Sequence, residues 1–145
     1  MGSILPRFTD GPRTYEAVEA LAGGVLVEAR AGGVDNPGCG IAAAGSLKVL
    51  GVAQKDASPT GGADRAPVAG VLDVTMAPKE VAVINDGFVP VKYAAAAAYG
   101  DRLIAAANGT VTPAGATPDA RTIVGWCAEK AGVALGGTGL TRINL

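Results

Sequence analysis

The chain has 145 residues, of which 49% are hydrophobic, and its 12 basic and 13 acidic residues give a net charge of −1. This length suits one domain, and because no lysine or arginine cluster is present we expect no nucleic-acid partner. Histidine is absent, which removes the commonest general base and metal ligand, so we expect no catalytic site, metal site or cofactor.

Much of the apolar content is alanine, which buries little area, so the predicted core is small and we expect stability to depend on a partner or on self-association. The two cysteines, Cys39 and Cys127, have no metal-binding spacing and are predicted to be buried free thiols. The longest apolar stretch, residues 93–99, is too short to span a bilayer, and the start of the chain has no signal-peptide pattern. We therefore expect a protein made in a cytoplasm, with no membrane partner.

Residues 1–12 are predicted to form an extended arm, because Pro6 and Pro12 interrupt regular hydrogen bonding. The arm carries three apolar residues, Ile4, Leu5 and Phe8, which need a surface to cover. They pack either on the protein's own core or on a neighbouring subunit, and we carry them forward as candidate interface residues.

Short runs rich in branched residues, separated by turn residues, predict about ten strands in a single β domain over residues 13–145. The first run, 14–21, has a composition that also fits a helix. The segment 34–40 has turn composition, and 55–67 is predicted to be a loop. The expected strands are 14–21, 25–29, 47–54, 71–75, 81–84, 88–91, 102–106, 110–113, 121–129 and 140–145.

Two local signals refine this pattern. The sequence Asn85-Asp-Gly lies between two of the strand runs and predicts a β-hairpin, and Pro90 restricts the second arm to a sheet edge or a bulge. The run of five alanines at 94–98, ended by Gly100, predicts one short helix. Since βαβ units need longer helices between strands, the pattern favours an all-β barrel or sandwich.

The chain also contains an internal repeat, with similar segments at about 23–57 and 100–131. Gly51 and Gly125 align 74 residues apart within similar strands, and Gly23 aligns with Gly100 at an offset of 77. Trp126, the only tryptophan, then stands where Val52 stands in the first copy. We expect Trp126 to fill the space between the two copies, or alternatively to anchor a subunit interface.

No nucleophile lies in a recognisable catalytic sequence motif. A carrier domain, which holds a covalently attached group on a lysine, is therefore the alternative to a purely structural role. The sequence Gly100-Asp-Arg-Leu is similar to a step of lipoyl and biotinyl carrier domains, which are also duplicated β-units. Those domains present a lysine at a tight hairpin, whereas Lys48 lies in a predicted strand and Lys92 lies outside any predicted turn. The carrier interpretation is therefore the weaker one.

The order of motifs along residues 14–145 resembles the small capsid cement, or decoration, proteins of tailed bacteriophages. The motifs are Gly23-Gly-Val-Leu-Val, Lys48-Val-Leu-Gly-Val-Ala-Gln-Lys-Asp-Ala, Phe88-Val-Pro-Val, Ala97-Ala-Tyr-Gly-Asp-Arg-Leu-Ile, Gly109-Thr-Val-Thr-Pro and Ile123-Val-Gly-Trp-Cys-Ala. The sequence departs from the family pattern at 78–80 and in the alanine run.

This resemblance implies a structural virion protein with an all-β body that binds the exterior of the capsid. It also implies a homotrimer at local threefold axes, with the major capsid protein as its partner. A phage tail-tube or head–tail connector protein is the alternative within the same class. The candidate interface residues are Ile4, Leu5, Phe8 and Trp126.

Overall fold

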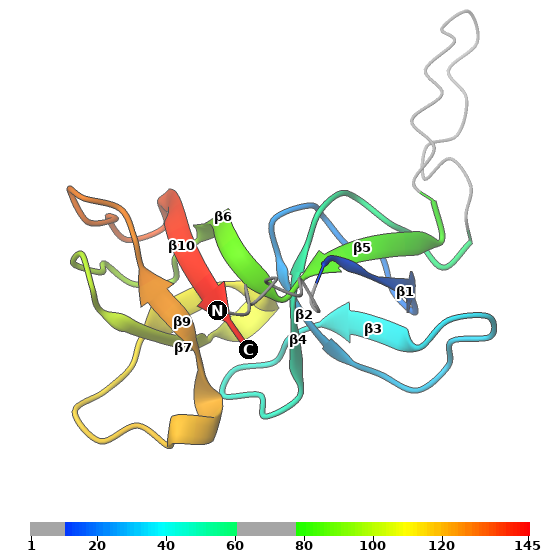
Figure 1. Ribbon diagram of the computed structural model, residues 1–145, viewed down its shortest axis with the longest axis horizontal. Helices are drawn as coiled ribbons and strands as arrows, with labels where there is room; N and C mark the ends of the chain where they lie inside the picture. The colour runs from blue at the N-terminus through cyan, green and yellow to red at the C-terminus, as the bar shows by residue number, and fades with distance from the viewer. Residues whose placement is uncertain (1–10, 61–77) are drawn as a thin grey trace, which may run out of the picture.

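The computed structural model describes residues 11–60 and 78–145, and in these residues the chain is all-β. Ten strands form two five-stranded sheets, one of which is a closed barrel, and two short 3-10 turns are the only helical elements of the described part (Figure 1). The predicted all-β class is therefore confirmed. None of the described residues forms a helix long and apolar enough to cross a lipid bilayer.

The closed barrel, which we call unit 1, is built from the first five strands in the order β1-β3-β2-β4-β5. Its ladders are antiparallel except for the parallel pairing of β1 with β3. Its strands are β1 (Arg13–Ala17), β2 (Leu26–Ala29), β3 (Gly38–Ile41), β4 (Val49–Ala53) and β5 (Glu80–Ile84).

The other sheet, which we call unit 2, has the order β6-β10-β9-β7-β8. Its two edge strands are brought together by a parallel bridge between Tyr93 and Val111. Its elements are β6 (Asp86–Lys92), β7 (Arg102–Ala105), the turn η1 (Ala107–Gly109), β8 (Val111–Pro113), the turn η2 (Ala120–Thr122), β9 (Ile123–Cys127) and β10 (Thr138–Asn144).

The two units repeat one another strand for strand, which confirms the internal duplication and extends it to all five strands. The pairing of β2 with β4 recurs as the pairing of β7 with β9, with a break in register at the same place. The matched pairs are Leu26↔Val52 with Arg102↔Trp126, Val27↔Gly51 with Leu103↔Gly125, and Glu28↔Val49 with Ile104↔Ile123. The parallel contact recurs as well, as Ala17↔Cys39 and Tyr93↔Val111.

This register corrects the sequence alignment by one residue in the first strand. Arg102 stands 76 residues after its counterpart Leu26, whereas the alignment of Gly23 with Gly100 gave 77. Trp126 does correspond to Val52, as the sequence predicted.

Each unit has an apolar cluster in its interior. The interior of unit 1 is small and includes Leu21, Val27, Cys39 and Val83. The cluster of unit 2 is built around Tyr93, whose side chain is fully buried and whose hydroxyl lies 2.7 Å from the Thr141 hydroxyl. The predicted burial of both cysteines as free thiols is confirmed.

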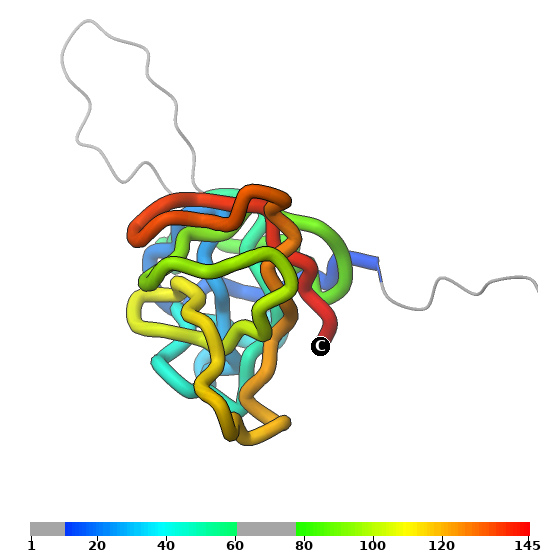
Figure 2. Tube along the Cα trace, turned by 90° about the vertical axis from the view of Figure 1, so that its left-hand side faces the viewer, coloured from blue at the N-terminus to red at the C-terminus, as the bar shows by residue number. Residues whose placement is uncertain are grey.

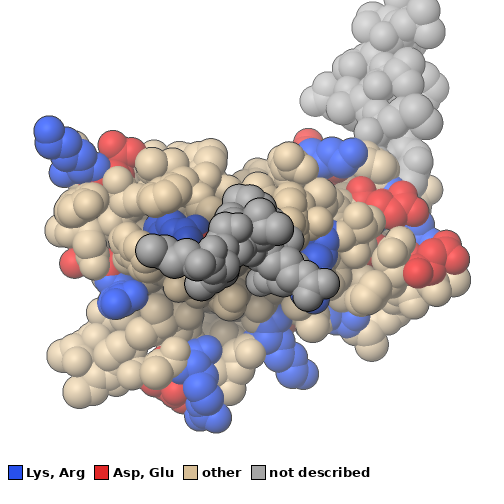
Figure 3. All heavy atoms as spheres, viewed as in Figure 1, with Lys and Arg blue, Asp and Glu red and all other residues tan. Residues whose placement is uncertain are grey.

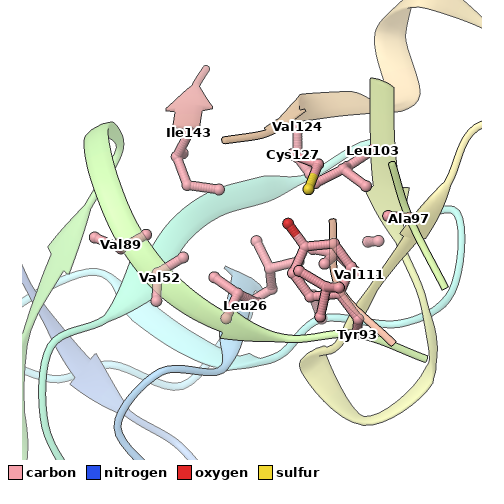
Figure 4. Close-up of a cluster of buried hydrophobic side chains, with 14 residues drawn as sticks. Leu26, Val52, Val89, Tyr93, Ala97, Leu103, Val111, Val124, Cys127 and Ile143 are labelled. Carbon is pink, nitrogen blue, oxygen red and sulfur yellow. The ribbon is translucent and has the colours of Figure 1, made fainter. Parts of the chain in front are cut away.

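The cluster of unit 2 also contains side chains from unit 1, and this shared packing joins the two units. Leu26 and Val52 extend from unit 1 to the side chains of unit 2, as Figure 4 shows for Leu26 near Tyr93 and Val52 near Val89. Backbone hydrogen bonds flank this contact, from Gly45 N–H to the Ala105 carbonyl at 2.9 Å and from Gly109 N–H to the Ala42 carbonyl at 3.3 Å. Viewed along the long axis, unit 2 lies in front of unit 1 (Figure 2).

Two local predictions between residues 85 and 98 are wrong. Residues 94–98 form no helix, because Tyr93 and Ala97 make bridges to Val111 and Val133 that hold this segment in an irregular path with bends. The Asn85-Asp-Gly sequence does not close a hairpin: β5 pairs with β1 and β4, whereas β6 pairs with β10. The chain thus leaves unit 1 and enters unit 2 at this point.

The segment 34–40, expected to be a turn, contains strand β3 at its end. Pro90 lies on the edge strand β6, as predicted. The arm with Ile4, Leu5 and Phe8 and the predicted strand at 71–75 lie outside the described residues.

The glycine at the register break of each unit gives the first testable prediction. A Cβ on Gly125 would lie 1.9 Å from the Arg142 carbonyl oxygen, and one on Gly51 would lie 2.2 Å from the Ile84 carbonyl oxygen. We expect Gly51→Ala and Gly125→Ala each to lower the free energy of unfolding by about 2 kcal/mol or more, since a backbone strand must shift.

Chemical denaturation measures this loss, with Gly115→Ala as the control, because a Cβ on Gly115 meets no atom within 4 Å. A loss at Gly51 or Gly125 no larger than that of the control would contradict the strand register.

Candidate functional site

A row of large side chains crosses unit 2 on its outer surface and forms the most prominent chemical feature of the described residues. We call it the outer row. Its members are direct neighbours on adjacent strands, because Arg102 pairs with Trp126, Trp126 with Arg142, and Arg142 with Phe88. A shallow hollow beside it is lined by Gly100, Arg102 and Trp126.

The side chains of the outer row stack on one another. The Arg102 guanidinium carbon lies 5.5 Å from the centroid of the Trp126 ring, and that of Arg142 lies 6.0 Å from the same ring. Arg142 also lies 5.3 Å from the centroid of the Phe88 ring. Cation–π contacts of this kind hold the aromatic rings in a fixed orientation while leaving them partly accessible to solvent.

The charges of the outer row are only partly neutralised. Arg142 forms an ion pair with Asp86. Arg102 is exposed, and no carboxylate of residues 11–60 or 78–145 lies within ion-pair distance of it. Over the face drawn in Figure 3, acidic and basic side chains are interspersed, so the row is not part of a broad basic patch on that face.

The outer row corresponds to a row of apolar residues on unit 1, which we call the inner row. Leu26 pairs with Val52 and Val52 with Ile84, at the positions that Arg102, Trp126 and Arg142 occupy in unit 2. The inner row is covered by unit 2, with Leu26 at 0% and Val52 at 2% exposure. The same position of the fold is therefore an internal contact in one unit and an open surface in the other.

This arrangement corrects one expectation for Trp126. Its side chain does not fill the space between the two units, because Val52 and Leu26 occupy that space and Trp126 lies half-buried on the outer surface. The large residue in the core of unit 2 is Tyr93 instead. The alternative expectation, that Trp126 anchors a subunit interface, stays a prediction.

A second feature lies at the opposite end of the molecule, in the loop between β2 and β3. We call residues 33–37 the Val34 loop. Val34 is 80% exposed, and the next residue, Asp35, is exposed as well. The corresponding turn of unit 2 is η1, where Gly109 contacts Leu26 of unit 1. The two loops thus occupy equivalent places. In η1 Gly109 is buried against unit 1, whereas residues 33–35 of the Val34 loop are exposed.

A buried carboxylate fixes the Val34 loop. Glu16 is 3% exposed, and its Oε2 accepts hydrogen bonds from the N–H groups of Val34 at 3.0 Å and Asp35 at 3.1 Å. Its Oε1 lies 2.6 Å from the Lys79 ammonium. The Lys79 ammonium, followed by the backbone donors of the loop, lowers the pKa of Glu16 from 4.5 to about 2. The exposed pair Val34 and Asp35 is therefore presented on a rigid loop.

Reactive groups elsewhere in the described chain have structural roles. The buried Glu28 carboxylate accepts a hydrogen bond from Ala43 N–H and pairs with Arg30. Burial raises the pKa of the Cys39 thiol to about 11, which disfavours the nucleophilic thiolate. No group of three or more potential metal ligands occurs within residues 11–60 and 78–145.

The two lysines of the carrier alternative do not lie at a hairpin tip. Lys92 is the last residue of strand β6, opposite Thr138, and Lys48 immediately precedes strand β4. Of the four interface candidates, Ile4, Leu5 and Phe8 lie outside the described residues, so only Trp126 is placed. The Val34 loop was not among the predicted sites, although a valine followed by an aspartate in a segment of turn composition is visible in the sequence.

Comparison with known proteins identifies a similar fold. No protein-family model matches the chain. No curated protein sequence matches it either. Among solved structures, the chain is similar to the head fiber gp8.5 N base of bacteriophage phi29, with a TM-score of 0.63 and 20% sequence identity. The match covers 92% of each chain, so it includes both units. At this identity the likeness concerns the fold.

The different environments of the inner and outer rows lead to a prediction for two corresponding residues. We expect Leu26→Ala to lower the free energy of unfolding by about 3 kcal/mol, because it opens a cavity in the packing between the units. At the equivalent position, Arg102→Ala should cost less than about 1 kcal/mol, because the side chain is exposed and contributes one cation–π contact. Denaturant unfolding in dilute solution measures both values. Equal losses at the two positions would contradict the assignment of inner and outer rows.

The Glu16 carboxylate leads to a prediction for pH dependence. Because folding lowers its pKa from 4.5 to about 2, its contribution to stability is fully present above pH 4.5 and is lost as the pH falls toward 2. We expect the melting temperature of the native protein to fall more steeply across this interval than that of Glu16→Gln. Thermal melts at several pH values check this, and parallel curves for the two proteins would count against it.

Proposed function

We propose that this chain is a structural protein of a bacteriophage head. The observation that carries the proposal is the similarity of the whole duplicated fold to the head fiber N base of phage phi29, over 92% of both chains. The motif order described from the sequence points to head decoration proteins and supports the same class independently of the fold.

More specifically, the chain binds the exterior of the capsid and stabilises the contacts between major capsid protein subunits. It acts there as a homotrimer at local threefold axes. A role of this kind requires only surfaces, and the conspicuous groups of the described chain are exposed surfaces: the stacked outer row and the rigid Val34 loop. Closed symmetric assembly is the usual arrangement for small subunits of such a lattice.

The chemistry of the chain agrees with a binding role. A sequence without histidine has few groups that change charge near neutral pH, so binding would vary little between about pH 6 and pH 8. Glu16, the carboxylate with the strongest pKa shift downward, remains ionised throughout this range. A capsid bound in this way would keep its bound copies through moderate changes of pH.

The direct test adds the purified full-length chain to phage heads that lack it. We expect the chain to co-sediment with the heads at a fixed ratio and to raise the temperature at which they release their DNA. Heads mixed with an unrelated β-barrel protein of similar size serve as the control. Failure to bind would overturn the proposal, and binding with no rise in the release temperature would remove the stabilising role. A hexameric ring on sizing would instead favour the connector alternative.

A further inference from the structure

The packing of unit 2 on unit 1 shows how one unit of this fold can bind a second, similar unit. Unit 1 contributes the inner row, and unit 2 contributes the apolar cluster around Tyr93, with the turn η1 beside it. In this contact Leu26 and Val52 are covered, and Gly109 lies directly against the Leu26 backbone. Because the two units repeat one another strand for strand, each half of this contact has a counterpart on the other unit.

The counterpart of the Tyr93 cluster is the filled interior of unit 1, but the counterparts of the inner row and of η1 are both exposed. The outer row corresponds to the inner row, and the Val34 loop corresponds to η1. The two open features cannot meet within one molecule, because the loop between β2 and β3 and the strands β7 and β9 lie at opposite ends of its long axis (Figure 1). Contact between the outer row and the Val34 loop is therefore possible only between different molecules.

The two open features are also chemically complementary. The outer row offers the partly accessible Trp126 ring and the Arg102 guanidinium, which has no carboxylate partner among the described residues. The Val34 loop offers an exposed apolar side chain and, next to it, the Asp35 carboxylate, for which the described chain shows no ion pair. Tryptophan and arginine are the residues most often found as anchors of protein interfaces.

We propose that the outer row binds a second copy of this chain through that copy's Val34 loop. In this contact Val34 packs on the Trp126 ring, and Asp35 forms an ion pair with Arg102. Each molecule carries one outer row and one Val34 loop, so the contact is head-to-tail. Contacts of this type form closed rings when the rotation between neighbours closes, and a trimer is one such ring.

This inference deepens the proposed function, since it assigns a surface to the self-association proposed above, but its test uses no capsid. Sedimentation velocity of the full-length chain over a range of concentrations measures association directly. We expect a reversible oligomer that Arg102→Glu weakens at least tenfold, and that Asp35→Arg weakens to a similar degree. The double variant Arg102→Glu/Asp35→Arg should recover most of the lost association, because it reverses both charges of one pair.

Controls separate the interface from effects on folding. Lys92→Glu makes the same change of charge at the end of strand β6, four residues beyond Phe88, and should leave association unchanged. Trp126→Ala should weaken association while melting cooperatively. A native chain that stays monomeric, single variants that associate normally, or a double variant with no recovery would each overturn the inference.

Two outcomes distinguish this inference from the proposed function. A monomeric native chain that still binds phage heads would remove the self-contact and leave the head role intact. If Trp126→Ala then abolished head binding, the outer row would belong to the capsid contact instead of the self-contact. Conversely, an oligomer with the predicted charge dependence that does not bind heads would support the self-contact and remove the head role.

Discussion

The packing of Leu26 and Val52 against unit 2 is the contact on which the rest of this structure depends. Each unit alone encloses a small core of valine, alanine and a few larger residues, which limits the apolar area it buries. The inner row adds fully buried leucine and valine side chains from unit 1 to the cluster around Tyr93 in unit 2. Two units of marginal size thereby share one larger core, and their relative orientation is fixed by the backbone hydrogen bonds beside it.

Duplication followed by divergence explains why the two surfaces now differ. At matching positions unit 1 has leucine, valine and isoleucine, whereas unit 2 has arginine, tryptophan and arginine. The first set suits permanent burial, because it has no polar group to satisfy. The second set suits a surface that is exposed in the free chain and covered in an assembly, because stacked guanidinium and indole groups tolerate water and still supply contact area. The fold thus has a permanent internal interface on unit 1 and an exposed surface at the matching position on unit 2.

The sequence predicted the all-β class, most of the strands and the duplication, because branched residues, glycine punctuation and the repeated glycines at 51 and 125 are local signals. It also correctly assigned Trp126 to the position that is equivalent to Val52. It failed where tertiary contacts decide the outcome. The alanines at 94–98 favour a helix, but the bridges of Tyr93 and Ala97 across the sheet outweigh this weak preference. The Asn85-Asp-Gly signal marks a turn but not whether the flanking strands pair with one another. Which of the two equivalent rows is covered depends on how the units pack on one another. The sequence does not show this, so Trp126 was wrongly predicted to lie between the units.

The single tryptophan allows the central claim, that the outer row is open in the free chain and covered on self-association, to be measured without any substitution. Acrylamide quenching of Trp126 fluorescence in the native protein, followed from dilute to concentrated solution, reports the exposure of this row directly. The account predicts ready quenching when dilute and a several-fold lower quenching constant once the protein associates. A quenching constant that stays the same while the protein is shown to associate would contradict it, since the contact would then lie on another face.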